Sequence, residues 1–127
     1  MPTFPANPIP AHRGIATATV TTSTDGLSDV IDLGGHCLVS VQMSTAWTAA
    51  SLTFRGSARS SAGMFDVYYD GTELSYTTTA SRRMTFSPED LAGVRFVQLR
   101  SGTAATPVAQ AAPRTVYLGV MPLALIK

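Results

Sequence analysis

Residues 47–71, WTAASLTFRGSARSSAGMFDVYYDG, have the pattern of two β-strands joined by a loop. In the first part, two apolar residues, Leu52 and Phe54, alternate with polar ones, and this period of two places them on one face of a β-strand. A loop rich in Ser and Gly, at 56–63, leads to a second alternating run, whose apolar face is expected to carry Phe65, Val67 and Tyr69. The sequence therefore predicts a β-hairpin with one buried face.

A second turn signal follows at Asp70 and Gly71, because Gly reaches positive φ without a steric penalty and Asp tolerates it. Residues 73–78 are therefore predicted to return antiparallel to residues 65–69. The same region holds three acids whose spacing is compatible with calcium: Asp66, Asp70 and Glu73. Asp-Gly favours a tight hairpin and no twelve-residue calcium loop is present, so we expect a turn here and no metal.

Further short segments have the composition or alternation of strands, at 16–22, 30–33, 37–44, 82–86, 94–101 and 114–121. The segment 37–44 is predicted to be a central strand, with one face formed by Val39, Val41 and Met43. One helical turn is expected at 87–91, and a loop at 102–113. No amphipathic helix competes with these strands. The predicted fold is all-β, an antiparallel β-sandwich or jelly roll.

The N-terminal residues have a different character. Four prolines fall within the first ten residues, which fixes φ, removes backbone donors and disfavours both a helix and a central strand. We therefore expect an extended arm at 1–14 and a single domain at 15–127. Apolar residues in the arm and in the short C-terminal tail are predicted to contact neighbouring subunits: Phe4, Pro5, Pro8, Ile9, Leu123, Leu125 and Ile126.

Composition limits the functional classes. Hydrophobic residues make up 45% of the 127 residues and charged residues 13%, about half the usual charged fraction. The formal net charge is +1, which gives no electrostatic reason to expect nucleic acid or a membrane surface as a partner. Cys37 is the single cysteine, so no disulfide within the chain and no zinc cluster is expected. The start of the chain lacks the pattern of a signal peptide, and we expect synthesis and retention inside the producing cell.

Chemistry-bearing motifs are sparse. No G-x-S-x-G context marks a nucleophile, and no glycine-rich phosphate loop is present. His36 and Cys37 are adjacent on a predicted strand and should point to opposite faces, so a buried structural thiol is the better interpretation. We therefore predict a protein that is not an enzyme and has no catalytic residues, cofactor or metal.

Two groups of residues are candidates for binding. The aromatic residues could form a flat platform for a sugar ring on a sheet edge, through Trp47, Tyr68, Tyr69 and Tyr76, although core packing would explain them as well. In the loop of the first hairpin, Arg55 and Arg59 could bond carbonyls or acids of another subunit.

Several stretches together resemble small virion proteins of tailed bacteriophages: VIDLGGHCLVSVQM, WTAASLTFRGSA, FDVYYDGTEL, SPEDLAGVRFVQLRSGT and RTVYLGV, within residues 30–120. The resemblance rests on the order of strands and turns, the tryptophan-led central strand and the corner at Arg100, Ser101 and Gly102. It implies a structural role in the head, neck or tail fibre. No functional residue is carried over from it.

The leading hypothesis is a head decoration or cement protein that binds the assembled capsid as a homo-oligomer. Its expected partners are copies of itself and the major capsid protein or other virion proteins, and its expected location is the virion, after synthesis in the host cytoplasm. One alternative is a head-fibre, neck or tail component. Another is a lectin-like module that binds a host glycan.

Overall fold

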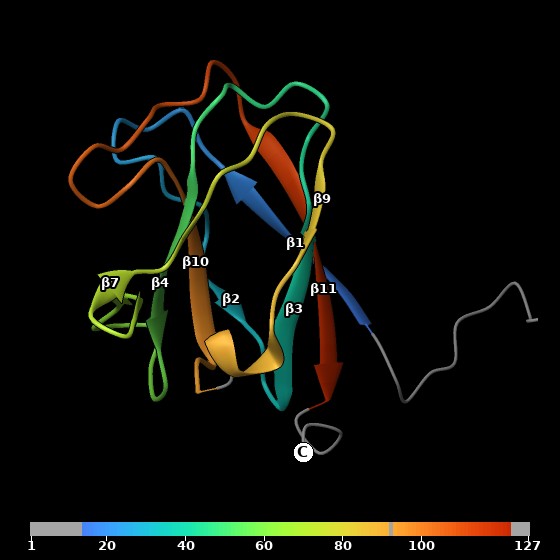
Figure 1. Ribbon diagram of the computed structural model, residues 1–127, viewed down its shortest axis with the longest axis vertical. Coiled ribbons are helices and arrows are strands. Elements are labelled where there is room, and N and C mark those ends of the chain that lie inside the picture. Colours follow the sequence, from blue (N-terminus) through green and yellow to red (C-terminus); the bar gives the residue numbers. More distant parts are fainter. Residues whose placement is uncertain (1–13, 92, 123–127) are drawn as a thin grey trace, which may run out of the picture.

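The computed structural model describes residues 14–91 and 93–122, and the predicted contact residues of the arm and the tail lie outside this part. The described chain forms two packed antiparallel sheets (Figure 1), which confirms the prediction of an all-β sandwich. The first sheet, called sheet A, has the strand order β1 (Gly14–Val20), β11 (Arg114–Pro122), β3 (His36–Gln42) and β9 (Arg83–Thr85). The second, called sheet B, has the order β2 (Ile31–Asp32), β10 (Phe96–Ser101), β4 (Leu52–Ser57) and β5 (Phe65–Asp66), with β8 (Ser75–Tyr76) also paired to β4.

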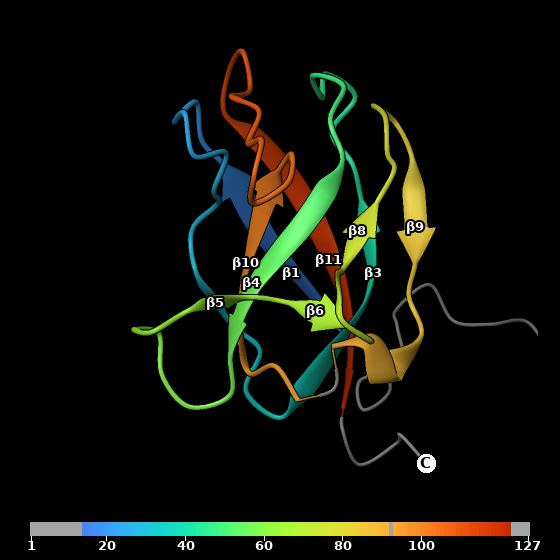
Figure 2. The same cartoon turned by 60° about the vertical axis from the view of Figure 1, so that its left-hand side comes forward.

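A small hairpin stands outside both sheets and consists of β6 (Tyr68–Tyr69) and β7 (Thr72–Glu73). Figure 2 shows β5 and β6 in front of β4 and β10 of sheet B. One 3₁₀ turn, η1 (Pro88–Asp90), follows β9 and confirms the predicted helical turn. Its preceding residue, Ser87, has an extended backbone but makes no capping hydrogen bond through its side chain.

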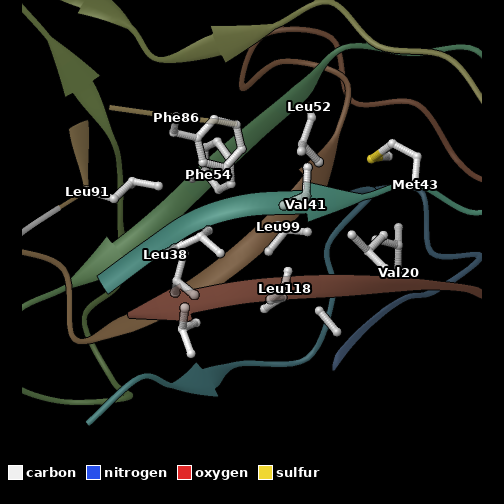
Figure 3. Packing of buried hydrophobic residues seen from close by; sticks show 14 of the residues in the cluster. Val20, Leu38, Val41, Met43, Leu52, Phe54, Phe86, Leu91, Leu99 and Leu118 are labelled. Atoms are coloured by element: carbon white, nitrogen blue, oxygen red, sulfur yellow. The ribbon is translucent and has the colours of Figure 1, made fainter. Parts of the chain in front are cut away.

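The core lies between the sheets and is built by alternating residues. On β11 the buried positions are Val116, Leu118 and Val120, as the period of two predicts. Leu52 and Phe54 of β4 are likewise fully buried, but Thr53 between them is buried as well, so the other face of β4 is also covered there and the prediction of a single buried face is wrong at Thr53. Figure 3 shows Leu118 and Val41 of sheet A directed towards Leu99 and Leu52 of sheet B. The ring of Phe54 also meets the rings of Tyr76 and Phe86 edge-on, at centroid distances of 6.0 and 5.8 Å.

The predicted face of the central strand is partly wrong. β3 is indeed central, but its register against β11 shifts, so that Gly119 lies opposite Ser40 while Val120 lies opposite Leu38. Val39 is therefore the extra residue of a β-bulge. The bulge moves Leu38 into the core with Val41 and Met43, and leaves Val39 half-buried.

The second half of the predicted hairpin also differs. β5 pairs with β4 antiparallel as expected, with Gly56 opposite Phe65. However, Phe65 is 75% exposed and Tyr69 is exposed as well, so the predicted apolar face is wrong at both positions. β5 has two residues and ends its sheet in the described chain, and Tyr69 lies on the separate hairpin. Neither position therefore has a second layer above it.

The turn at Asp70 and Gly71 is confirmed. Both residues have positive φ, of 52° and 81°, and Tyr69 pairs with Thr72 across them. The predicted return strand at 73–78 is correct for its first residues, because Leu74 N donates to Val67 O at 2.9 Å. Its later residues pair instead with β4, where Tyr76 lies opposite Leu52. Residues 72–74 thus pair within the small hairpin, and the residues that follow pair with β4, so the small hairpin lies next to β4.

Candidate functional site

A buried arginine is the centre of the polar structure at one end of sheet B. Arg100 belongs to β10 and lies opposite Thr53 of β4 in the antiparallel register. Its Nε donates to Thr53 Oγ1 at 3.0 Å, and its two terminal nitrogens donate to Asp66 Oδ1 at 2.8 Å and Glu73 Oε2 at 2.7 Å. The side chain of Arg100 is 6% exposed and that of Glu73 is 17% exposed. This group of four residues is called the Arg100 cluster below.

The Arg100 cluster connects several segments that are distant in sequence. Thr53 Oγ1 donates to Gly102 O at 2.6 Å, and Ala104 N donates to Glu73 Oε2 at 3.0 Å. The small hairpin and the loop at 102–113 are thereby attached to the sandwich. The acids Asp66 and Glu73, whose spacing suggested calcium, are instead both paired with a single guanidinium. Sequence reasoning named both acids but missed Arg100 as their partner, because the partnership depends on the pairing of β10 with β4.

A buried amide holds the neighbouring end of the molecule. Gln110 Oε1 accepts a hydrogen bond from Thr48 N at 2.8 Å, while Gln110 Nε2 donates to Thr48 O at 3.0 Å and Ser101 Oγ at 2.8 Å. Within the described residues, every buried side-chain nitrogen and oxygen has a hydrogen-bond partner. The buried polar groups therefore serve the internal structure.

The predicted sugar-binding aromatics do not form one platform. Trp47 is buried in the core, where its Nε1 donates to Ala50 O at 3.3 Å. Tyr76 is half-buried against Phe86, and its hydroxyl donates to Asp90 Oδ2 at 2.8 Å. Burial and this hydrogen bond raise the pKa of the Tyr76 phenol. Tyr68 and Tyr69 are exposed on the small hairpin, so the four residues predicted as one group are divided between core and surface.

Three exposed aromatic residues lie close together in the sequence. Phe65 on β5 and Tyr68 and Tyr69 on β6 are called the aromatic hairpin surface below. Because Tyr68 and Tyr69 are adjacent on β6, their side chains point to opposite sides of that strand. Asp66, which lies between them in sequence, is tied to Arg100, so the segment is attached to the sandwich at its base. Exposed aromatic side chains on an attached segment are typical of a protein-binding surface.

The loop arginines have different roles. Arg55 is half-buried and its Nη2 donates to Met64 O at 2.8 Å, so it closes the loop of its own chain. Arg59 is exposed. The prediction that both arginines face another subunit is therefore not supported for Arg55, whose guanidinium already bonds a carbonyl of the same loop.

A groove crosses the outer face of sheet A. It has a volume of about 260 Å³ and is lined by residues from all four strands, among them Ile15, Ser40, Gln42, Arg83, Tyr117 and Gly119. Ser40 and Gly119 lie opposite each other, and a Cβ at Gly119 would collide with Ser40 Oγ. Since these small residues lie between larger ones, the face is hollowed. Ile15 is 79% exposed and Tyr117 is 50% exposed at its sides.

The single thiol is structural. Cys37 is buried and its Sγ donates to Pro88 O at 3.1 Å. Burial raises the pKa of this thiol, and the charge of Asp90 acts in the same direction, so the nucleophilic thiolate is disfavoured. This agrees with the prediction of a buried structural cysteine next to an exposed His36.

Two further observations concern the whole of the described chain. No helix within residues 14–91 and 93–122 is long and apolar enough to cross a membrane. Comparison with protein-family models, with curated proteins and with solved structures finds no match for this chain.

Proposed function

We propose that this chain is a structural protein of a tailed-phage virion, a head decoration or cement subunit that binds the assembled head as a homo-oligomer. The observation that carries the proposal is the presence of two apolar surfaces on opposite sides of the sandwich. The groove lies on sheet A, whereas the aromatic hairpin surface is carried by β5 and β6, strands that lie on the side of sheet B (Figure 2). A subunit that covers a shell needs one contact to the shell and another to its own copies.

The aromatic hairpin surface is the proposed contact to the major capsid protein or to another virion protein. Aromatic side chains are enriched in the centres of protein interfaces and supply much of their binding energy. Because Asp66 and Glu73 bind Arg100, the hairpin is held in one arrangement before it meets a partner. Such pre-organisation reduces the entropy lost on binding. Arg59 is exposed in the loop between β4 and β5, and it belongs to the same proposed interface.

Low charge supports the same conclusion. With 13% charged residues, much of the surface is composed of Ser, Thr, Ala and apolar groups, which suits contact with other subunits. The proposal treats the chain as a binding subunit and not an enzyme, without a cofactor and without nucleic acid or membrane as a partner. The proposal also includes synthesis of the protein in the host cytoplasm and its location in the virion.

The test uses shells assembled from the major capsid protein. The purified full chain should sediment with expanded shells and saturate at a copy number comparable to that of the capsid subunit. The variants Phe65→Ser and Tyr69→Ser should weaken this binding, whereas Val30→Ser, which removes an exposed apolar residue on the approach to β2, should not. Saturation at a few copies per shell would contradict the lattice role and favour a head-fibre, neck or tail position. Absence of binding would contradict the proposal as a whole.

A second candidate is carbohydrate binding, and the exposure of Tyr68 and Tyr69 favours it. Trp47 is buried and so is no longer part of this candidate. A glycan array with the full chain distinguishes the two functions. Tight binding to a host glycan that is lost in Tyr68→Ser or Tyr69→Ser, with shell binding absent, would establish the lectin-like function in place of the cement function.

A further inference from the structure

The groove on sheet A has the chemistry of a site for an extended peptide. Its sides are apolar, from Ile15 and the ring of Tyr117, and its rim carries the donors Gln42 and Arg83 together with the Tyr117 hydroxyl. Within residues 14–91 and 93–122, these three polar side chains donate no hydrogen bond. The volume, about 260 Å³, lies below the range of about 300–1,000 Å³ that is typical of small-molecule sites. A few side chains of a peptide would fill it.

Apolar walls combined with unused hydrogen-bond donors suit a peptide bound as a polyproline II helix. A polyproline II helix makes no internal hydrogen bonds, so all of its carbonyls remain available as acceptors. Proline-rich segments bind aromatic-lined grooves in this conformation, and they lose little entropy because the helix is largely preformed. The groove offers an aromatic ring to pack on the prolines and donors for the carbonyls between them.

The chain itself contains a segment that matches these requirements. In the N-terminal sequence MPTFPANPIPAHRG, Pro2, Pro5 and Pro8 recur every third residue, which is the repeat of the polyproline II helix. Such a segment places the three prolines along one edge. The 13 residues before Gly14 would extend about 40 Å at about 3.1 Å per residue. Three strand spacings of about 4.8 Å amount to about 14 Å, so the segment is long enough to cross the groove and still reach from another molecule.

We propose that the groove of each subunit binds residues 1–13 of a neighbouring copy, so that arms are exchanged between subunits. The position of Gly14 favours exchange over binding within one chain. Gly14 is a paired residue of β1, opposite Val120, and there the backbone runs along the sheet edge. The groove runs across the strands from Ile15 to Arg83. The chain's own arm would have to turn sideways out of the strand direction directly before Gly14 and fold onto the sheet face, whereas the arm of a second copy is not bound by this turn.

This inference rests on the self-association that is part of the proposed function, and it names the segment and the surface that produce it. The test uses two variants of the full chain. The arm variant carries Pro5→Gly and Pro8→Gly. The groove variant carries Ile15→Thr and Tyr117→Thr, two exposed positions where a β-branched residue retains the strand preference. A far-ultraviolet circular dichroism spectrum like that of the wild type and a cooperative unfolding transition show that both variants fold; their midpoints should be lower, because the monomers lack the stabilisation that association gives the wild type.

Sedimentation should show an oligomer for the wild-type chain and monomers for each variant alone. Isotope-labelled arm variant is then mixed with unlabelled groove variant, which retains an intact arm. The amide signals of Ser40, Gln42 and Gly119 in the labelled chain should shift on mixing. They should not shift when the added chain carries all four substitutions.

Unshifted signals with the intact arm would overturn the proposal. A second outcome would also overturn the proposal. If the wild-type chain is a monomer and its groove amide signals differ from those of the arm variant, the arm binds the groove of the same chain. Shells are absent from this assay, so its failure is separate from failure of shell binding. Exchange without shell binding would contradict the cement function alone, and shell binding without exchange would contradict the arm exchange alone.

Discussion

Arg100 Nη2 and Glu73 Oε2 are 2.7 Å apart in a buried ion pair that joins β10, an interior strand of sheet B, to the small hairpin outside the sheet. Asp66 Oδ1 binds the other terminal nitrogen at 2.8 Å. The pair fixes the hairpin that carries Tyr68 and Tyr69. Stability and the proposed binding surface therefore depend on the same guanidinium.

Removing Glu73 should destabilise the fold. Glu73→Ala leaves the Arg100 charge buried with one carboxylate fewer, and breaking a buried pair in this way typically costs about 3–5 kcal/mol. We expect a loss near the lower end of this range, because Asp66 remains bound to Arg100. Urea unfolding measures the change. Glu89→Ala removes an exposed acid of η1 and is the matched control; equal stability of the two variants would contradict the structural role of the pair.

Gly102 should not tolerate a side chain. Its φ is +91°, and a Cβ there would lie 2.5 Å from Thr106 O and 2.7 Å from Val108 N. Gly63 also has positive φ, of +70°, but nothing lies within 4 Å of its Cβ position. Gly63→Ala should cost about 1–2 kcal/mol from backbone strain, and Gly102→Ala should cost clearly more because the clash adds to the strain. Thermal unfolding of both variants compares them, and equal losses would contradict the tight packing of the corner.

Alkaline pH should destabilise the protein through Tyr76. Its pKa is raised by burial and by the hydrogen bond to Asp90, so the folded state holds the phenolic proton more tightly than the unfolded chain. This contribution to stability is complete below pH of about 10 and is lost as the pH rises further, because the unfolded state then releases the proton first. Tyr76→Phe should reduce the fall in the free energy of unfolding above that pH.

The raised pKa of Cys37 produces a loss of the same sign from somewhat lower pH, so this comparison is made in a Cys37→Ala background. Stability is followed by urea unfolding at several pH values. An unchanged alkaline slope in Tyr76→Phe would contradict the role of the Tyr76–Asp90 hydrogen bond.

The thiol of Cys37 should react slowly in the folded protein. It is buried, bonded to Pro88 O and disfavoured as a thiolate, whereas the reagent needs an accessible thiolate. Labelling with a thiol-specific disulfide reagent should be slow in native buffer and fast in denaturant. His36→Ala should leave the native rate unchanged, because His36 is exposed on the opposite side of the strand. Fast labelling of the native protein would contradict the structural role of this cysteine.

Elements that depend only on neighbouring residues could be predicted from the amino-acid sequence. A period of two in Val116, Leu118 and Val120 selects a strand with one buried face, since alternate side chains point to opposite sides. The same period in Leu52 and Phe54 predicted the strand and its core face, but not that Thr53 on the opposite face is buried too. Asp70 and Gly71 formed the predicted turn because the positive φ that a tight hairpin needs is a property of these residues alone. These features do not depend on which strand lies next to which.

Other features depend on partners that are distant in sequence, and they become visible only in the folded chain. The bulge at Val39 placed Leu38 in the core, because it arises from the register against β11 and leaves no mark on the alternation. Phe65 and Tyr69 became surface residues because their strands have no second layer, and Trp47 became a core residue. Arg100 was buried because β10 pairs with β4 beneath the hairpin that carries Asp66 and Glu73. The guanidinium of Arg100 can be buried only when all of its hydrogen-bond acceptors are assembled around it, and these come from three segments that are separate in sequence.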